Sequence, residues 1–295
     1  MTHWLAIINP RSNGGRTLAL LPSILDRLQP LAEKTVITEY PGHAAELALN
    51  ASAYGGLAAV GGDGTVFEIL QGLDRARQRI AVIPAGRGNS LARDLGLPHT
   101  LASIDTVRST HPATVDLMEV VFNTSEGTEQ ERICASTVAV GYPTTVAQLA
   151  GRKFGKFGKL CYAAAAAAVC PTPFRARLAC NGQQQSARHL TGLVANNTRH
   201  MANFVAFPEA SLEDGYFDVM ELDAGFLKQS IHNVSAFSRF HFYTPATPIR
   251  TKTAEVLLDE PRELLLDGEI YSDVISVRIR ILPAALTCNR ADRKK

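Results

Sequence analysis

Cysteine, unbalanced charge and long apolar runs are all scarce in this sequence of 295 residues. The five cysteines contain no C-x-x-C pair, so we expect reduced and mostly buried thiols rather than a disulfide framework or a zinc site. A net charge of +2 is too small for a general polyanion binder, which argues against nucleic acid as the partner. No uncharged apolar run reaches about 18 residues, and residues 1–8 lack the basic start of a secretory signal. We therefore expect a cytoplasmic protein without a membrane span.

Several catalytic motifs are also missing. There is no H-E-x-x-H, no Walker A sequence, and no serine with a nearby histidine–aspartate signature. Gly86-x-Gly88 follows an apolar segment as in a dinucleotide fingerprint, but Leu91 stands where the third small residue would be. These absences argue against a zinc protease, a P-loop enzyme, a hydrolase triad and a Rossmann NAD site.

The first third of the chain alternates between strand and helix patterns, which predicts a doubly wound parallel sheet covered on both faces. Expected strands are 4–9, 35–39, 57–61 and 80–84, and expected helices are 16–31, 43–53, 65–73 and 90–95. We predict an α/β domain over residues 1–118.

The pattern changes near residue 115, after which strands dominate. Expected strands are 115–122, 133–141, 174–180, 189–196, 216–222, 254–258 and 276–282, with helices only near 144–149, 159–169 and 227–237. Asn181-Gly182 is a strong hairpin turn. We predict a mainly antiparallel β domain over 119–287, followed by a basic tail over 288–295.

Three glycine-containing segments each lie between a predicted strand and a predicted helix. They read Asn-Pro-Arg-Ser-Asn-Gly-Gly at 9–15, Gly-Gly-Asp-Gly-Thr at 61–65 and Pro-Ala-Gly-Arg-Gly-Asn-Ser at 84–90. The carboxyl ends of parallel strands line the ligand crevice of an open sheet, so three such loops at one edge can surround one polyanion. Glycines let backbone N–H groups approach phosphate oxygens, and the helix that follows adds its positive dipole end.

Asp63 stands among these donors. A carboxylate at this place would repel a phosphate unless a divalent cation lies between them, which makes Asp63 a natural Mg²⁺ ligand. A tight turn in which Asp63 only caps a helix is the alternative for this loop taken alone.

The three segments together resemble the diacylglycerol kinase catalytic domain family, which includes bacterial lipid kinases, sphingosine kinases and ceramide kinases. Pro208–Gly215 resembles its P-x-A-x-x-D-D-G segment, and Leu266-Asp267-Gly268-Glu269 resembles its D-G-E motif. The matches run in family order from residue 5 to about 287. The resemblance implies that the domain over 1–118 binds ATP and that the β-rich domain over 119–287 binds the lipid substrate. It also implies an active site in the cleft between the two domains, with ATP and Mg²⁺ as cofactors.

The resemblance also implies roles for individual positions. Nucleotide contacts are implied for Asn9, Ser12, Gly14, Thr38, Gly62, Asp63, Gly64, Thr65 and Glu68. In the third loop we add Gly86 and Arg87, because Arg87 can contact a phosphate. Asp63 would organise the catalytic Mg²⁺, and Ser211, Asp214 and Tyr216 would form a separate metal site. Asp267 and Glu269 match the motif that supplies the general base; which of them does so is open, and Asp267-Gly268 alone is typical of a hairpin turn.

The chain departs from many bacterial members at two positions of the third loop. Arg87 replaces threonine or serine, and Ser90 replaces aspartate. These changes leave the lipid open. We predict an ATP-dependent lipid kinase that transfers the γ-phosphate to a hydroxyl of diacylglycerol or a related lipid in phospholipid biosynthesis. The alternatives are an NAD-kinase-like phosphotransferase and a non-catalytic nucleotide- or lipid-binding homologue.

The segment Gly151–Lys159 carries four cations and two phenylalanines without an acid. This composition suits peripheral contact with an anionic bilayer, here the inner face of the membrane, although it also fits a solvated loop before a helix. The oligomeric state is open, with a homodimer among the options.

Overall fold

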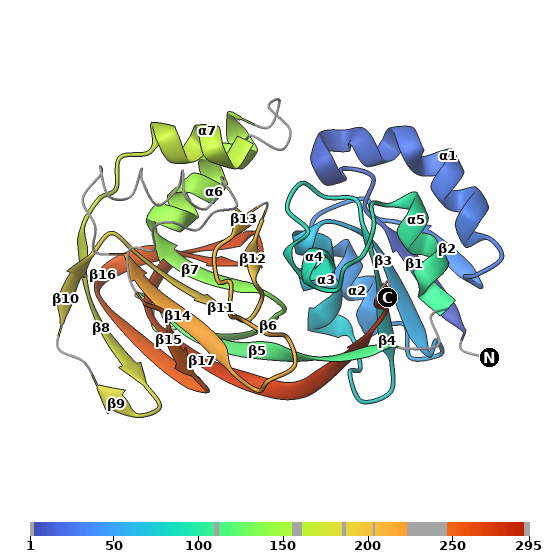
Figure 1. The fold of residues 1–295 in the computed structure, drawn as a ribbon. Helices are drawn as coiled ribbons and strands as arrows, with labels where there is room; N and C mark the ends of the chain where they lie inside the picture. Colours follow the sequence, from blue (N-terminus) through green and yellow to red (C-terminus); the bar gives the residue numbers. More distant parts are fainter. Residues whose placement is uncertain are drawn as a thin grey trace. The chain divides into compact units, whose positions relative to one another are not determined.

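A computed structural model describes residues 3–108, 112–154, 161–184, 187–202, 204–222 and 247–291 (Figure 1). It divides into two compact units, the first formed by Met1–Leu117 with Pro283–Lys295 and the second by Met118–Leu282. Both limits fall inside strands, namely β5 (Ala113–Thr124) and β17 (Glu269–Cys288). The expected fold class is confirmed, since an α/β unit is followed by a mainly antiparallel β unit.

The first unit is built on a parallel sheet with the strand order β2-β1-β3-β4. Its strands are β1 (Trp4–Ile8), β2 (Lys34–Ile37), β3 (Gly56–Gly61) and β4 (Arg79–Pro84), and its helices are α1 (Arg16–Leu28), α2 (His43–Leu49), α3 (Asp63–Gly72), α4 (Ser90–Asp94) and α5 (Leu101–Ile104). A one-turn 3₁₀ helix η1 (Ser12–Gly15) precedes α1, and a second, η2 (Asp105–Arg108), follows α5. Every strand and helix expected over residues 4–95 is present, with ends that differ by a few residues.

The strand order explains why the sheet is covered on both faces. The chain runs from β1 outward to β2 through α1, and then back across β1 to β3 through α2. Right-handed crossovers in opposite directions place the connecting helices on opposite faces. Ile24 and Leu28 of α1 pack with alternate strand residues such as Ile8 and Val60 in one buried cluster. The direction of winding reverses between β1 and β3, and an open α/β sheet binds its ligands at such a point.

The second unit is a twisted antiparallel sheet. Its main path is β15-β14-β11-β7-β16-β17. Beside this path, β5 pairs with β17 and carries β6, and β8 pairs with β16 and carries β9 and β10. The strands are β6 (Glu129–Cys134), β7 (Thr137–Gly141), β8 (Phe174–Cys180), β9 (Gln183–Gln184), β10 (Arg188–Leu190), β11 (Gly192–Asn196), β14 (Phe217–Leu222), β15 (Ile249–Thr251) and β16 (Thr253–Leu266). A separate short hairpin pairs β12 (His200–Met201) with β13 (Phe204–Val205). The predicted Asn181-Gly182 turn is confirmed: both residues have positive φ, and Cys180 pairs with Gln183.

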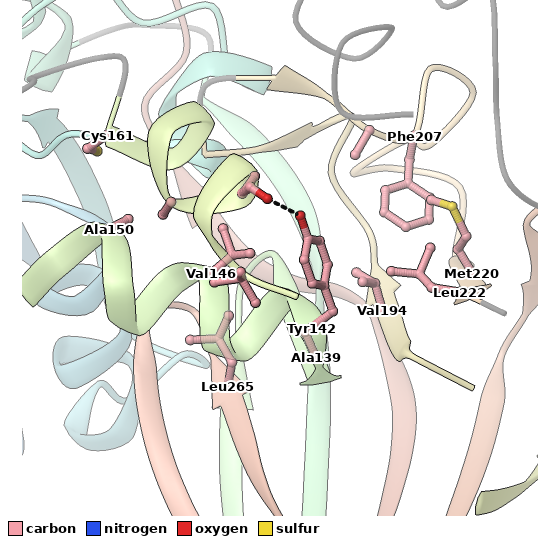
Figure 2. Close-up of a cluster of buried hydrophobic side chains, with 14 of the residues drawn as sticks. Ala139, Tyr142, Val146, Ala150, Cys161, Val194, Phe207, Met220, Leu222 and Leu265 are labelled. Atoms are coloured by element: carbon pink, nitrogen blue, oxygen red, sulfur yellow. Dashed lines mark hydrogen bonds between the residues drawn. The ribbon is translucent and has the colours of Figure 1, made fainter. Parts of the chain in front are cut away.

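Two helices, α6 (Tyr142–Arg152) and α7 (Cys161–Ala168), pack on this sheet. Figure 2 shows the cluster beneath them, in which Val146 of α6 lies with sheet residues such as Val194 and Leu265. The hydroxyl of Tyr142 donates to the carbonyl oxygen of Ala166 at 2.7 Å. This bond satisfies the buried phenol and joins the two helices.

Two expected strands are each divided in the structure. Residues 133–141 form β6 and β7, because the backbone N–H groups of Ala135 and Ser136 donate to the Asp267 carboxylate. Residues 189–196 form β10 and β11, because both the N–H and the hydroxyl of Thr191 donate to the carbonyl oxygen of Leu222. The expected helix 227–237 and residues 155–159 of the basic segment lie outside the described residues.

The first residues of the tail expected over 288–295 are bonded to the parallel sheet. Cys288 still belongs to β17 and pairs with Ile80 of β4. The Asn289 side chain exchanges two hydrogen bonds with the backbone of Val82, at 2.7 and 3.1 Å. Four cysteines are buried and Cys170 is exposed. Among the described residues, no helix has the length and apolar character needed to cross a membrane.

Candidate active site

The three glycine loops follow β1, β3 and β4 at the carboxyl edge of the parallel sheet. Asn9 joins the first loop to the second, because its Nδ2 donates to the Thr65 hydroxyl at 3.0 Å. The Thr17 hydroxyl lies between the carbonyl oxygens of Ser12 and Ala85, at 3.2 and 3.3 Å, and so joins the first loop to the third. Two short polar side chains therefore hold the three loops together.

The first loop has an unusual backbone. Asn13, Gly14 and Gly15 have consecutive positive φ values of 55°, 67° and 85°. The two glycines leave the backbone of this turn without a Cβ, so an anion can approach its N–H groups closely. The positive φ favours glycine at position 14, and the end of the Arg87 side chain lies close by, since a Cβ on Gly14 would come within 2.7 Å of its Nη2.

The second and third loops approach each other at two glycines. A Cβ on Gly62 would lie 3.1 Å from the Cα of Gly86. Gly62 is also the N-cap of α3, and no side chain caps this helix. The N-terminal N–H groups and the positive end of the α3 dipole thus lie at the loop edge, beside Gly64 and the buried Thr65.

Asp63 connects the second loop to the third. Its Oδ2 accepts from the Asn89 backbone N–H at 2.8 Å, and its Oδ1 accepts from that of Ser90 at 2.7 Å. Asn89 is itself left-handed, with φ 57°, and its side chain bonds both backbone groups of Gly86. The capping role considered for Asp63 is therefore present, although the cap serves α4 rather than the helix that contains Asp63. A carboxylate oxygen can accept a hydrogen bond and bind a metal ion at the same time, so this cap is compatible with the predicted metal role of Asp63.

Arg87 lies beside the first loop as a half-buried cation. Its Nε is buried and has no hydrogen-bond partner among the described residues. An unsatisfied buried donor costs free energy, which an anion bound at the loops would recover.

Two of the predicted nucleotide-binding residues, Glu68 and Thr38, lie outside the three glycine loops. Glu68 lies one turn into α3, and its Oε2 accepts from the Ala44 backbone N–H at 3.1 Å, so it holds the start of α2. Thr38 follows β2, and its backbone N–H donates to the Ile8 carbonyl oxygen at 2.8 Å. The other nine predicted nucleotide residues belong to the three loops.

In the second unit, Asp267 and Gly268 form the two-residue turn between β16 and β17, and Leu266 pairs with Glu269. The Asp267 carboxylate is buried and accepts four hydrogen bonds. Three come from the backbone N–H groups of Ala135, Ser136 and Thr137, at 2.5, 2.9 and 2.7 Å, and one from the Ser136 hydroxyl at 2.7 Å. Burial raises the pKa of Asp267, and the four hydrogen bonds oppose that rise. Glu269, two residues on, is exposed.

In the predicted metal site at residues 211–216, the Asp214 carboxylate forms an ion pair with an arginine of the same chain. Oδ1 of Asp214 accepts from the Tyr216 backbone N–H at 3.0 Å, and Oδ2 contacts the Arg250 guanidinium. Arg250 and Lys252 also lie over the Tyr216 ring, at 5.4 and 4.9 Å from its centroid. The Ser211 hydroxyl accepts from Glu213. The site stays a prediction, and a divalent ion at Asp214 would have to displace Arg250.

The hydrogen-bond partners of Asp63 and Asp267 could not be predicted from the sequence. Asn89 carried a weak signal, because asparagine tolerates left-handed backbone after a glycine. Ser136 and Thr137 carried none, since they lie about 130 positions from Asp267 along the chain.

A substitution at Gly86 tests whether the close approach of Gly62 and Gly86 is needed for the loop geometry. A methyl group in Gly86→Ala would overlap the Cα of Gly62 and come within 2.7 Å of Oδ1 of Asn89. We expect a loss of about 1–3 kcal/mol in the free energy of unfolding, because backbone cannot yield as a side chain can. Thermal melting would measure it. Gly151→Ala in α6 is the control, since its Cβ meets open space and should not destabilise. Equal melting of both variants would contradict the packing argument.

Loops of this kind at the switch point of a parallel sheet are typical of α/β units that bind phosphate groups. The family model named Diacylglycerol kinase catalytic domain matches residues 3–120. A diacylglycerol kinase of Mycobacterium tuberculosis is 30% identical over 225 residues, which cover 72% of this chain and 71% of that protein. One from Staphylococcus carnosus is 28% identical over 276 residues, covering 89% and 87%.

A crystal structure of a diacylglycerol kinase from Bacillus anthracis shares the fold, with a TM-score of 0.78 and 22% identity over 98% of this chain and 97% of that one. The sequence matches place the chain in the diacylglycerol kinase catalytic domain family. The chain is accordingly a lipid kinase.

Proposed function

We propose that the protein transfers the γ-phosphoryl group of ATP, with Mg²⁺, to a hydroxyl of diacylglycerol or a related lipid. The observation that carries this proposal is the convergence of three glycine loops at the switch point, with Asp63 bonded across two of them. Phosphoryl transfer asks a protein mainly for alignment and charge neutralisation, and these loops supply N–H donors, a helix dipole and a cation.

On the nucleotide side, the N–H groups of the first loop and of the α3 N-terminus bind phosphate oxygens. Asp63 fixes the spacing of the second and third loops and is the carboxylate that would bind a metal ion there. Mg²⁺ bound with the nucleotide supplies neutralisation of the phosphate charge. Arg87 adds a fixed positive charge beside Gly14.

On the acceptor side, the geometry favours Glu269 over Asp267 as the group that takes the hydroxyl proton. A general base must come within hydrogen-bond reach of that proton. Both oxygens of Asp267 are buried and already accept four hydrogen bonds, whereas Glu269 is exposed. Asp267 then acts as a positioning residue, which fixes the turn from which Glu269 projects.

The test is transfer of labelled γ-phosphate from ATP and Mg²⁺ to a panel of lipids in mixed micelles. The panel contains diacylglycerol, monoacylglycerol, a sphingoid base, phosphatidylglycerol and a polyprenol, with NAD and buffer as controls. Label in a lipid is the expected outcome and would identify the substrate class. Label in NAD alone, or in no acceptor while ATP binds, would contradict the proposal.

Arg87→Met should weaken binding of ATP about 10- to 150-fold, the range expected for loss of a charged hydrogen bond of about 1.5–3 kcal/mol. Binding of adenosine, which has no phosphate, should not change. Isothermal titration with ATP, ADP and adenosine would measure the difference.

Arg79→Met is the matched control for this variant. Arg79 is exposed at the amino end of β4, away from the loops, and its removal should leave all three affinities unchanged. An equal loss of ATP and adenosine affinity in Arg87→Met would show that Arg87 supports the fold rather than a phosphate.

A further inference from the structure

The turn that leads into β14 is joined to the neighbouring strand β15 by an ion pair. Asp214 lies in this turn, and Arg250 lies on β15, which pairs with β14 (Figure 1). The Arg250 guanidinium contacts Oδ2 of Asp214 and also lies over the Tyr216 ring. Oδ2 is buried, although the Asp214 side chain as a whole is 26% exposed. The guanidinium therefore covers the oxygen that a metal ion at this turn would need.

The oxygens of this turn suit a single positive charge better than a double one. The ligands implied for a metal ion are the Asp214 carboxylate and the backbone carbonyls of Ser211 and Tyr216, so one ligand is charged. Oδ1 of Asp214 already accepts from the Tyr216 N–H at 3.0 Å. Mg²⁺ and Ca²⁺ take about six or more oxygen ligands, and their affinity rises with the number of carboxylates. Among the described residues, no group of three or more His, Cys, Asp and Glu side chains could hold a metal ion. One guanidinium, by contrast, neutralises one carboxylate without excess charge.

The Tyr216 ring adds a second reason for a cation that belongs to the chain. The face of a tyrosine ring attracts positive charge. Cζ of Arg250 and Nζ of Lys252 lie 5.4 and 4.9 Å from the ring centroid. A guanidinium is planar and weakly hydrated, so it can stack on a ring while its N–H groups face a carboxylate. Arg250 thus contacts Asp214 and Tyr216 together and joins the turn to β15.

We propose that the Arg250 guanidinium takes the place of a divalent cation at the turn 211–216. The turn is then held by a positive charge of the chain itself, and its stability needs no metal ion. This inference differs from the metal site that the family resemblance implies at Ser211, Asp214 and Tyr216. The Mg²⁺ proposed to act with ATP is a separate ion, at Asp63 of the first unit. The inference therefore does not depend on the proposed function.

Thermal melting without nucleotide tests the proposal, first in EDTA and then with increasing millimolar Mg²⁺ or Ca²⁺. Arg250→Met removes the internal cation, and Asp214→Asn removes the carboxylate. Arg188→Met is the matched control, because Arg188 also pairs with a carboxylate of the β14 region, Glu221 at 3.3 Å, where no metal site is predicted. Metal content of the purified wild type and of Asp214→Asn is measured by mass spectrometry after dialysis.

The wild type should respond to the divalent ions no more than Asp214→Asn does, because Arg250 already neutralises Asp214. Arg250→Met should melt at a lower temperature than the wild type in EDTA. Its melting temperature should then rise with the logarithm of the Ca²⁺ concentration, as for a ligand that binds only the folded state. This rise should disappear in Arg250→Met/Asp214→Asn, and Arg188→Met should not show it.

Three results would overturn the proposal. The first is a metal-dependent rise in the wild type that Asp214→Asn abolishes, because Asp214 would then bind a metal ion beside Arg250. The second is an equal response of Arg250→Met and Arg188→Met to both ions, because the place of Arg250 would then not accept a metal ion. The third is a stoichiometric divalent ion in the purified wild type that is lost in Asp214→Asn. The first and third results need no variant of Arg250, so they decide the question even if Arg250→Met does not fold.

Discussion

Asp63→Asn is expected to lower kcat/KM for ATP at least about a hundredfold, the scale of losing one preorganised electrostatic group. The carboxylate now accepts from Asn89 and Ser90 at 2.8 and 2.7 Å. An amide keeps one acceptor and turns an NH₂ toward the other N–H. The variant therefore loses the negative charge available to Mg²⁺ and also separates the second loop from the third. Steady-state kinetics with saturating lipid and varied ATP would measure the effect.

Two further variants separate charge from position. Asp63→Glu keeps the charge, but its longer side chain cannot place both oxygens on the same two N–H groups, so we expect a loss nearly as large. Asp74→Asn is the control, because Asp74 also accepts a backbone N–H, from Ala76 at 3.2 Å, in an exposed turn of the same unit. Full activity in Asp63→Glu would show that charge alone matters. Retention of more than about a tenth of wild-type activity in Asp63→Asn would contradict the catalytic role.

The first unit could be predicted from sequence because its signals are local. Each strand is a short apolar run, each loop contains glycines directly after that run, and each helix follows at once. The Asn181-Gly182 hairpin is local in the same way. Right-handed connections then fix which helix covers which face. The positions of the three glycine loops at one edge follow from these local features.

The interactions that shape the sites could not be predicted, because they join distant positions. Asp267 reaches Ser136 across 131 positions, and no local pattern marks either partner. The same bonds divide the strand that was expected to be continuous over 133–141. Asp214 is likewise paired with Arg250, which lies on a later strand, β15. A motif match predicts which residue types are present but not which of their lone pairs are already used.

Glu269→Gln should separate the two carboxylates of the Leu-Asp-Gly-Glu turn. Glu269 is exposed at the start of β17, so the amide should fit without a change in melting temperature. As the proposed proton acceptor, Glu269 should contribute about 10²- to 10⁴-fold to kcat. We expect that loss with KM for ATP unchanged, measured by initial rates at saturating lipid. Glu263→Gln on β16 is the control, being exposed on the preceding strand of the same hairpin. An active Glu269→Gln variant would return the proton acceptor to Asp267.

Asp267→Asn, in contrast to Glu269→Gln, should lower the stability of the fold. Its NH₂ group would face the Ala135 N–H, which now donates to Oδ2 at 2.5 Å. Leaving a buried donor unsatisfied costs about 1–3 kcal/mol, which lowers the melting temperature by several degrees. Asp273→Asn is a close control, because Asp273 is also left-handed, with φ 60°, but exposed. Asparagine tolerates that backbone in both places, so a difference between the variants reports the buried hydrogen bonds.

The pH dependence of stability distinguishes this structural role further. Burial raises the folded-state pKa of Asp267 above that of the unfolded chain. The stability that this group contributes is then fully present below the unfolded pKa of about 3.9 and is lost as pH rises through the folded pKa. Asp267→Asn has no such group. The stability advantage of the wild type over the variant should therefore be largest near pH 4 and shrink toward neutral pH, as measured by urea unfolding. An advantage that grows with pH would mean that the four hydrogen bonds outweigh burial and hold the pKa of Asp267 below its usual value.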